Sequence, residues 1–228
     1  MGSDIKLEIS NLCKSYKNHI IFDKASFSAE GGNCIALVGE NGCGKSTLLN
    51  IIAGMLKADK GTVSCKIDGA EIPLKKSFDY ISYVPQTNFL VSNLSAYDNL
   101  LFWYQGNRKK LDADIQEGFI QELGVNEYIE RKISKMSAGM QKRVAIACAL
   151  ANKPKILLLD EVNASLDIIC KLQIQKMRSS YAAAGNIVIF STHEEGDIDA
   201  CNKIQYINNS QITSMPVAPL KEIFKDKL

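Results

Sequence analysis

The segment from Gly39 to Thr47 combines residue types that bind phosphate in proteins. It reads Gly-Glu-Asn-Gly-Cys-Gly-Lys-Ser-Thr and completes the pattern G-x-x-x-x-G-K-[ST]. Its glycines let the backbone turn so that successive N–H groups converge on phosphate oxygens. The lysine can reach β- and γ-phosphates, and the serine hydroxyl suits Mg²⁺. We therefore expect a nucleoside triphosphate to be held by Gly39, Asn41, Gly42, Cys43, Gly44, Lys45, Ser46 and Thr47.

A strand and a helix are expected on either side of this loop. Residues 34–38 read Cys-Ile-Ala-Leu-Val, a short buried-strand pattern, and apolar residues from Leu48 to Ile52 repeat at helical spacing. This strand-loop-helix context is the one in which the motif binds phosphate, because the start of the helix adds its dipole. A coincidental loop is the competing interpretation, and the context argues against it.

A second candidate for chemistry is the acidic pair Asp160 and Glu161. It follows the apolar residues 156–159, which predict a central buried strand. Open α/β sheets bind ligands at the carboxyl ends of their strands, so Asp160 is the natural partner of Mg²⁺. Glu161 could polarise or deprotonate the water that attacks the γ-phosphate. The competing interpretation is an acid that caps the next helix.

The remaining pattern predicts two kinds of sheet. Alternation predicts strands at 6–10, 20–27 and 62–67, in an antiparallel layer around the phosphate loop. Helical spacing covers 96–104, 111–123 and 138–151. Strands at 156–159 and 187–190 then alternate with a helix at about 166–183, which predicts a parallel sheet covered on both faces.

Composition limits the function classes. The chain has 228 residues, and a hydrophobic content of 46% can supply a real core. A net charge of +2 lacks the excess of basic residues that is typical of nucleic-acid-binding proteins. The basic cluster 108–110 is expected to be a solvated loop. The longest apolar stretch, residues 144–151, is too short to cross a bilayer, and no apolar signal segment opens the chain.

The cysteines predict a reducing compartment. There are seven, an odd number without a C-x-x-C pair, so they are expected to behave as small buried hydrophobes. Cys43 differs because it lies in the phosphate loop. It is either a tolerated small residue or a thiol whose oxidation or alkylation blocks nucleotide.

Further motifs narrow the class. Tyr83-Val84-Pro85-Gln86 ends a predicted strand, residues 136–144 open a helix, and 164–167 and 191–194 follow Asp160. In this order the motifs resemble the nucleotide-binding domain of ATP-binding cassette proteins, over essentially the whole chain. The resemblance implies the α/β class and a P-loop NTPase: a RecA-like, mainly parallel sheet core with an antiparallel β-subdomain and an inserted α-helical subdomain.

The resemblance also implies one ATPase domain over residues 1–228. Its expected parts are a β-layer with the phosphate loop at about 1–85, a helical subdomain at about 88–152, and the remainder of the core at about 153–228.

Individual roles follow from the resemblance. Tyr16 resembles the aromatic residue that stacks on adenine, although an ordinary strand-edge tyrosine is the alternative. Gln86 resembles the glutamine that contacts Mg²⁺ or the attacking water, and His193 resembles the switch histidine at the γ-phosphate. Asp167 resembles an aspartate at the boundary of paired domains, and it also suits a helix N-terminus. The implied catalytic residues are Lys45, Gln86, Glu161 and His193, and the implied Mg²⁺ ligands are Ser46, Gln86 and Asp160.

The signature segment of the family usually reads Leu-Ser-Gly-Gly-Gln, whereas residues 136–140 read Met-Ser-Ala-Gly-Met. Ser137 and Gly139 are retained and are expected to face the γ-phosphate of a nucleotide held by a partner subunit. Ala138 adds a methyl group, and Met140 removes a side-chain amide. A homodimer is expected to close on ATP with weakened hydrolysis or affinity, and a heterodimer is the alternative.

The implied function is the ATP-hydrolysing subunit of a transporter, with ATP and Mg²⁺ as cofactors. Two such domains are expected to clamp ATP head to tail and to drive a separate membrane-spanning permease. The chain is then expected to be cytoplasmic and peripheral on the inner face of the cell membrane. Phe89 and Leu90 are the better candidates for the permease contact, whereas Leu101 and Phe102 are expected to pack in the core.

Two other classes compete with a transporter subunit. One is a soluble cassette ATPase that remodels a protein or ribosome complex, but such chains usually carry two cassettes and a charged linker. The other is a non-catalytic nucleotide-binding regulator, and the presence of Glu161 and His193 argues against it.

Overall fold

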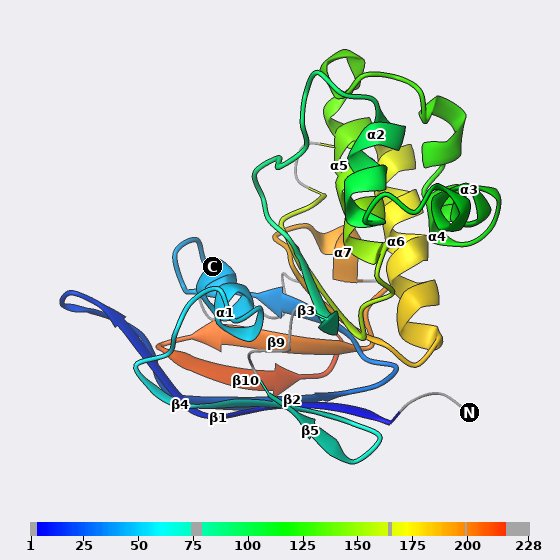
Figure 1. Ribbon diagram of the computed structural model, residues 1–228. Coiled ribbons are helices and arrows are strands. Elements are labelled where there is room, and N and C mark those ends of the chain that lie inside the picture. The colour runs from blue at the N-terminus through cyan, green and yellow to red at the C-terminus, as the bar shows by residue number, and fades with distance from the viewer. Residues whose placement is uncertain (1–3, 74–78, 164–165, 199, 218–228) are drawn as a thin grey trace.

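In the computed structural model, residues 4–73, 79–163, 166–198 and 200–217 are described. They form two sheets (Figure 1). One has six strands in the order β10-β9-β3-β8-β7-β6, and the other has four in the order β2-β1-β4-β5. The first is parallel except for β10, and the second is antiparallel. This arrangement confirms the predicted fold class.

The six-stranded sheet is built from short apolar segments. Its strands are β3 (Cys34–Val38), β6 (Ile81–Val84), β7 (Ile156–Asp160), β8 (Ile187–Ser191), β9 (Lys203–Asn208) and β10 (Gln211–Met215). All five residues of each of β3, β7 and β8 are buried, as expected for central parallel strands covered on both faces. The predicted strands at 156–159 and 187–190 are confirmed, each with one more residue.

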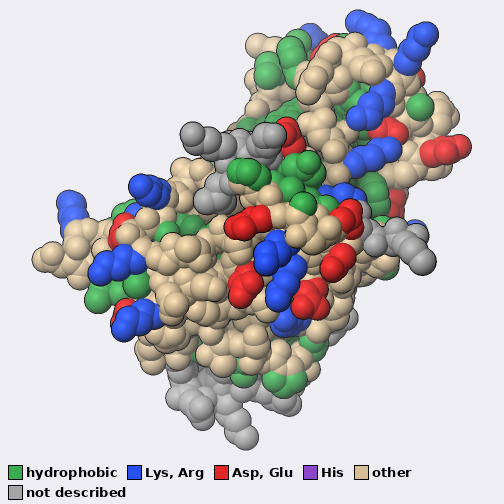
Figure 2. Space-filling model, turned by 60° about the horizontal axis from the view of Figure 1, so that its bottom comes forward, with side chains coloured by type: hydrophobic (Ala, Val, Ile, Leu, Met, Phe, Trp, Pro, Cys, Tyr) green, Lys and Arg blue, Asp and Glu red, His purple; other side chains and the backbone are tan. Residues whose placement is uncertain are grey.

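The antiparallel sheet contains longer strands than the sequence predicts. They are β1 (Ile5–Tyr16), β2 (His19–Glu30), β4 (Lys60–Ile67) and β5 (Ala70–Ile72). Register shifts between β1 and β2 occur after Ile9, Leu12 and Lys14, and these irregularities break the strict alternation that a sequence pattern requires. Figure 2 turns this side of the molecule forward and shows Lys and Arg interspersed with Asp and Glu.

The helices cover both faces of the six-stranded sheet. They are α1 (Lys45–Ile52), α2 (Ala96–Trp103), α3 (Arg108–Gln116), α4 (Phe119–Glu122), α5 (Ala138–Leu150), α6 (Ile168–Ala183) and α7 (Glu195–Ile198). Short 3-10 turns lie at η2 (Val125–Tyr128) and η3 (Ile133–Lys135). The expected helices at 96–104, 138–151 and 166–183 are confirmed to within two residues at either end.

Two predictions about this helical region are wrong. The helix expected at 111–123 is two helices, because Glu117 is extended and Gly118 adopts φ 86° between α3 and α4. The basic cluster 108–110 is the first turn of α3 rather than a loop, since the Asn107 side chain accepts from the Lys110 N–H and caps the helix. The three basic side chains are nevertheless exposed.

Each face of the six-stranded sheet packs in its own hydrophobic core. In β3, Cys34, Ala36 and Val38 pack with α2 to α6, whereas Ile35 and Leu37 pack with α1 and the antiparallel sheet. Successive side chains of a strand point to opposite faces of its sheet, which explains why α2 to α6 pack on one face and α1 with the antiparallel sheet on the other (Figure 1). The phosphate loop lies between β3 and α1 and is therefore anchored to the second core.

Helix α2 shows one more departure from expectation. Leu100 is fully buried and Leu101 is partly buried against the core, but Phe102 is 65% exposed, which corrects its predicted core position. A residue two places after Leu100 projects from a different side of a helix with 3.6 residues per turn. Within the described ranges, no helix is long and apolar enough to cross a membrane.

Candidate nucleotide-binding site

The phosphate loop is held closed by its own lysine. Lys45 Nζ donates to the carbonyl oxygens of Gly39 at 3.0 Å and Glu40 at 3.1 Å. Burial lowers the pKa of the Lys45 ammonium, an effect partly opposed by nearby thiol and carboxyl groups. Beside the loop lies a cleft of about 140 Å³, whose lining residues are Asn41, Gly42, Gly44, Lys45, Ser46, Thr47 and Glu161. The structure thus brings Glu161 to the residues that the sequence predicts for phosphate.

Gly44 explains why the loop turns into α1 at this point. It is the N-cap of α1, in the left-handed region at φ 112°. A Cβ there would lie 2.5 Å from Cγ2 of Ile21 and 2.9 Å from Cζ of Phe22. Both neighbours belong to the core of β2, so any other residue would be strained and would clash.

Asp160 is a buried carboxylate at the end of β7 with two hydroxyl partners. Tyr83 Oη donates to its Oδ2 at 3.0 Å, and Ser191 Oγ donates to its Oδ1 at 2.7 Å. Burial, and then the neighbouring Asp160 charge, raise the pKa of the Tyr83 phenol, which therefore stays a donor. A carboxylate with ordered donors is fixed in orientation, as a metal ligand at a strand end requires.

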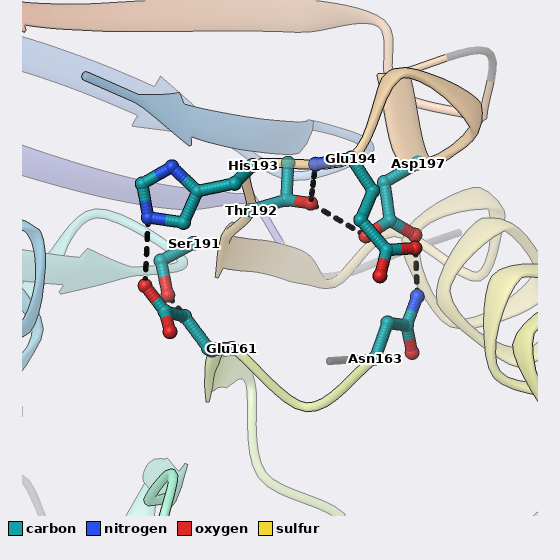
Figure 3. A pocket seen from close by; sticks show the side chains of 7 residues that line it. All are labelled: Glu161, Asn163, Ser191, Thr192, His193, Glu194 and Asp197. Carbon is teal, nitrogen blue, oxygen red and sulfur yellow. Dashed lines mark hydrogen bonds and ion pairs between the residues drawn. The ribbon is translucent and has the colours of Figure 1, made fainter. Parts of the chain in front are cut away.

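Glu161 is clamped between Gln86 and His193. Gln86 Nε2 donates to Glu161 Oε2 at 3.0 Å, and His193 Nε2 lies 2.9 Å from Glu161 Oε1 (Figure 3). The Glu161 backbone adopts φ 46°, and its N–H donates to Ser191 Oγ at 2.8 Å. Two residues that are far apart in the sequence, Gln86 and His193, therefore meet at the Glu161 carboxylate.

Helix α5 holds the loop that carries Gln86. Lys142 Nζ donates to the carbonyl oxygens of Pro85 at 3.2 Å and of Gln86 at 2.9 Å. Asn88 Nδ2 donates to Gln141 Oε1 at 2.6 Å. These hydrogen bonds connect α5 directly to the loop whose Gln86 side chain contacts Glu161.

The start of α5 contains the signature segment. Ser137 is exposed and caps the helix, accepting from the Met140 N–H at 3.3 Å. Ala138 is exposed as well, and together with Gln86 and Glu161 it lines a cleft of about 300 Å³. Gly139 is buried where α5 meets α6: a Cβ there would lie 2.5 Å from Cys170 Sγ. The predicted contacts of Ser137 and Gly139 with a partner's nucleotide remain predictions.

Two further candidates, Tyr16 and Asp167, lie at the end of a strand and at the start of a helix. Tyr16 ends β1 and is 47% exposed, with Lys14 Nζ 5.3 Å from its ring centre. Its role at adenine remains a prediction. Asp167 is the N-cap of α6 and accepts from the Cys170 N–H at 2.9 Å, which confirms its expected position at a helix N-terminus. Ala164 and Ser165, which precede it in the motif, lie outside the described residues.

Several residues of the site were not assigned roles from the sequence. Ser191, Tyr83 and Lys142 contact Asp160, Glu161 or the Gln86 backbone. Ser191 could have been found, because it directly follows the strand 187–190, and neighbouring parallel strands bring Asp160 opposite Ser191. The role of Lys142 carries no such signal, since it depends on the packing of α5 against a loop.

This fold and this site define an ATP-binding cassette of the P-loop class. The family profile described as ABC transporter matches residues 22–164, more than half of the chain. The chain therefore belongs to the ABC transporter family.

Named relatives include export and import proteins. Nod factor export ATP-binding protein I of Sinorhizobium fredii is 30% identical over 215 residues, which are 92% of this chain and 62% of that protein. The sn-glycerol-3-phosphate import ATP-binding protein UgpC of Psychromonas ingrahamii is 34% identical over 216 residues, 90% of this chain and 56% of that protein. The chain thus spans less than two thirds of the length of both relatives.

Solved structures agree on the fold. A nucleotide-free ATP-binding cassette from an ABC transporter matches with a TM-score of 0.80 at 22% identity, covering 98% of this chain and 94% of that one. The ADP conformation of an ATP-binding cassette matches with a TM-score of 0.82, also at 22% identity, over 98% and 95%.

Proposed function

We propose that this chain is the ATP-hydrolysing subunit of an ABC transporter, which dimerises head to tail on ATP and drives a separate membrane-spanning partner. The observation that carries the proposal is the position of Glu161. Its carboxylate lies between the Gln86 amide and the His193 ring and also lines the cleft of the phosphate loop. A carboxylate at that point can act as general base on a water that attacks the terminal phosphate.

ATP would be held by the phosphate loop. The N–H groups of the loop, the start of α1 and the Lys45 ammonium all direct positive charge toward the cleft. On binding phosphate, Lys45 would exchange its two carbonyl acceptors for phosphate oxygens. The exposed ring of Tyr16 would stack on adenine.

The residues present fit a Mg²⁺ ion. Ser46, Gln86 and Asp160 supply hydroxyl, amide and carboxylate oxygens, which are the donors that Mg²⁺ takes alongside substrate phosphates. A bound ion would supply positive charge that offsets the charge of the ATP phosphates. Ser191 and Tyr83 keep the Asp160 carboxylate oriented for this contact.

Hydrolysis then depends on Glu161 and its two neighbours. Glu161 accepts a proton from the attacking water, Gln86 orients the carboxylate, and His193 stabilises charge at the γ-phosphate. These groups act mainly by position, since phosphoryl transfer requires alignment and charge stabilisation rather than covalent catalysis.

The partners follow from the surface that the chain leaves exposed. Ser137 and Gly139 at the start of α5 would complete the site of a second ATPase subunit, identical or different. Phe89 and Leu90, which the sequence favours for the permease contact, are partly buried and pack against the core of the helical region. The permease would instead contact the cleft of about 460 Å³ formed by Leu94, Asp98, Leu101, Phe102, Gln105 and Gly106. The chain would then lie on the cytoplasmic face of the cell membrane. No relative named above is a soluble remodelling ATPase, so the names support the transporter function.

The test is Glu161→Gln, measured for ATP binding and ATP hydrolysis separately. Binding should persist, and the hydrolysis rate should fall about 10²- to 10⁴-fold, the contribution typical of a positioned general base. Glu195→Gln is the matched control, because Glu195 is an exposed carboxylate two residues after His193. Equal hydrolysis by the wild type and Glu161→Gln would contradict the proposed role of Glu161. Absence of ATP binding by the wild type would contradict the function as a whole.

A further inference from the structure

One buried carboxylate, Asp197, collects donors from three separate segments. Thr192 Oγ1 donates to Asp197 Oδ2 at 2.6 Å, and Arg178 Nη2 from α6 donates to Oδ1 at 2.9 Å. Asn163 Nδ2 donates to the same Oδ1. All four side chains are buried, with exposures of 5% for Asp197 and 0% for Arg178. An ionised carboxylate is acceptor-only, so it can satisfy three donors at once.

Two of these donors are close neighbours of the residues at the hydrolysis site. Thr192 directly precedes His193, and Asn163 follows Glu161 by two residues. In Figure 3 the His193–Glu161 contact lies at one end of a cleft and the Asn163–Asp197 contact at the other, with both loops running between them. The cleft has a volume of about 240 Å³. Fixing Thr192 and Asn163 on one carboxylate therefore fixes the separation of the two loops that carry His193 and Glu161.

Arg178 shows that a simple packing role is an incomplete explanation. Its guanidinium lies 3.8 Å from the ring centre of Phe190 in β8, and its Nε and Nη1 atoms are buried without a partner among the described residues. Apolar side chains can often replace a buried ion pair without loss of stability, so packing alone does not require an arginine here. The arginine supplies the charge that a buried carboxylate needs if it is to remain an acceptor for Thr192 and Asn163.

We propose that Asp197, paired with Arg178, is a positioning residue for ATP hydrolysis that holds the His193 loop in register with the Glu161 loop. Asp197 itself touches neither nucleotide nor water in this role. The inference rests on the proposed function, because it concerns the efficiency of the same hydrolysis site.

Thr192 offers a matched pair of substitutions for the test. Thr192→Val keeps the shape and removes the hydroxyl, whereas Thr192→Ser keeps the hydroxyl and removes the methyl group. We expect Thr192→Val to lower kcat about tenfold, equivalent to about 1.4 kcal/mol of barrier, with the KM for ATP changed less than about twofold. Thr192→Ser should stay close to the wild-type kcat. A role in stability alone would lower the melting temperature and leave kcat per folded molecule unchanged.

A second variant covers the case in which Thr192→Val does not fold. Asn163→Leu removes the donor of the other loop, keeps the branching at Cγ, and should also lower kcat with little change in KM. The control is Ser180→Ala, because the Ser180 hydroxyl lies on the same helix as Arg178 but donates to Glu122.

The outcomes separate this inference from the proposed function. Folded Thr192→Val or Asn163→Leu with the wild-type kcat would overturn the positioning role while leaving ATP hydrolysis intact. A low kcat in Thr192→Ser equal to that of Thr192→Val would overturn it too, since the hydroxyl would then not be the relevant group. A wild type that binds ATP without hydrolysing it would instead contradict the proposed function.

Discussion

Glu161 has a backbone conformation that few non-glycine residues adopt. At φ 46° it lies in the left-handed region, which costs free energy for a side chain with a Cβ. The hydrogen bond from its N–H to Ser191 Oγ helps to hold this conformation, and the turn directs the carboxylate toward Gln86 and His193. Such local strain is common at functional positions. Here the conformation places the Glu161 carboxylate in the cleft beside the phosphate loop.

Cys43 provides a direct probe of that loop. Burial raises the pKa of its thiol, although the nearby Lys45 charge partly opposes the shift. Because the thiolate is the reactive form, alkylation by N-ethylmaleimide should be slow at pH 7 and should rise about tenfold from pH 7 to pH 8. Bound ATP should protect Cys43. Mass spectrometry of the labelled peptides measures both effects.

Cys13 serves as an internal control, because it is part-exposed in β1 and should label equally with and without ATP. Labelling of Cys43 that is unaffected by saturating ATP would contradict a nucleotide in contact with the loop, and would favour a merely tolerated small residue.

The secondary elements were predictable where their apolar pattern is complete. Strands β3, β7 and β8 and helices α2 and α5 follow directly from apolar runs or helical spacing. The full length of β1 was not, because irregular pairing with β2 disrupts alternation after Ile9. The break between α3 and α4 lies at Gly118, which adopts a positive φ. The helical spacing of apolar residues does not predict that backbone conformation.

The same limit applies to the site. Asp160 and Glu161 could be found from a strand followed by acids, and Gln86 and His193 from a family resemblance. Arg178, Asn163 and Asp197 could not, since their meeting depends on how α6, α7 and the loop after β7 pack together.

The contact between α5 and α6 predicts a specific pair of stability effects. Gly139→Ala would place a Cβ 2.5 Å from Cys170 Sγ, and overpacking of this kind costs about 1 to 3 kcal/mol. Each kcal/mol lowers the melting temperature of a chain of this size by about 2 to 4 °C. Adding Cys170→Ala removes the sulfur and should restore most of the loss. Thermal denaturation of the two single variants and the double variant measures this.

A double variant that melts as low as Gly139→Ala alone would show that the Gly139–Cys170 approach does not limit the packing of α5 on α6. Recovery would establish that the residue has a structural role within one chain, in addition to the contact proposed with a partner's nucleotide.

At the scale of the whole molecule, the phosphate loop and the signature segment are attached to different hydrophobic cores. The loop is anchored to the core shared by α1 and the antiparallel sheet, whereas the signature segment begins α5 in the other core. Lys142 and Gln141 of α5 hydrogen-bond to the Gln86 backbone and to Asn88, so α5 is connected to the loop that contacts Glu161. A partner that closes on α5 would therefore act on the surroundings of Glu161 through these bonds. This arrangement gives a physical reason for hydrolysis to depend on a second subunit.

The most direct test of that composite site is the mass of Glu161→Gln in solution, measured by gel filtration with light scattering. Slowed hydrolysis should leave ATP bound, so the ATP-bound dimer should accumulate. We predict a monomer without nucleotide and a dimer with ATP and Mg²⁺. A monomer under both conditions, in a protein shown to bind ATP, would contradict closure of two copies of this chain on ATP.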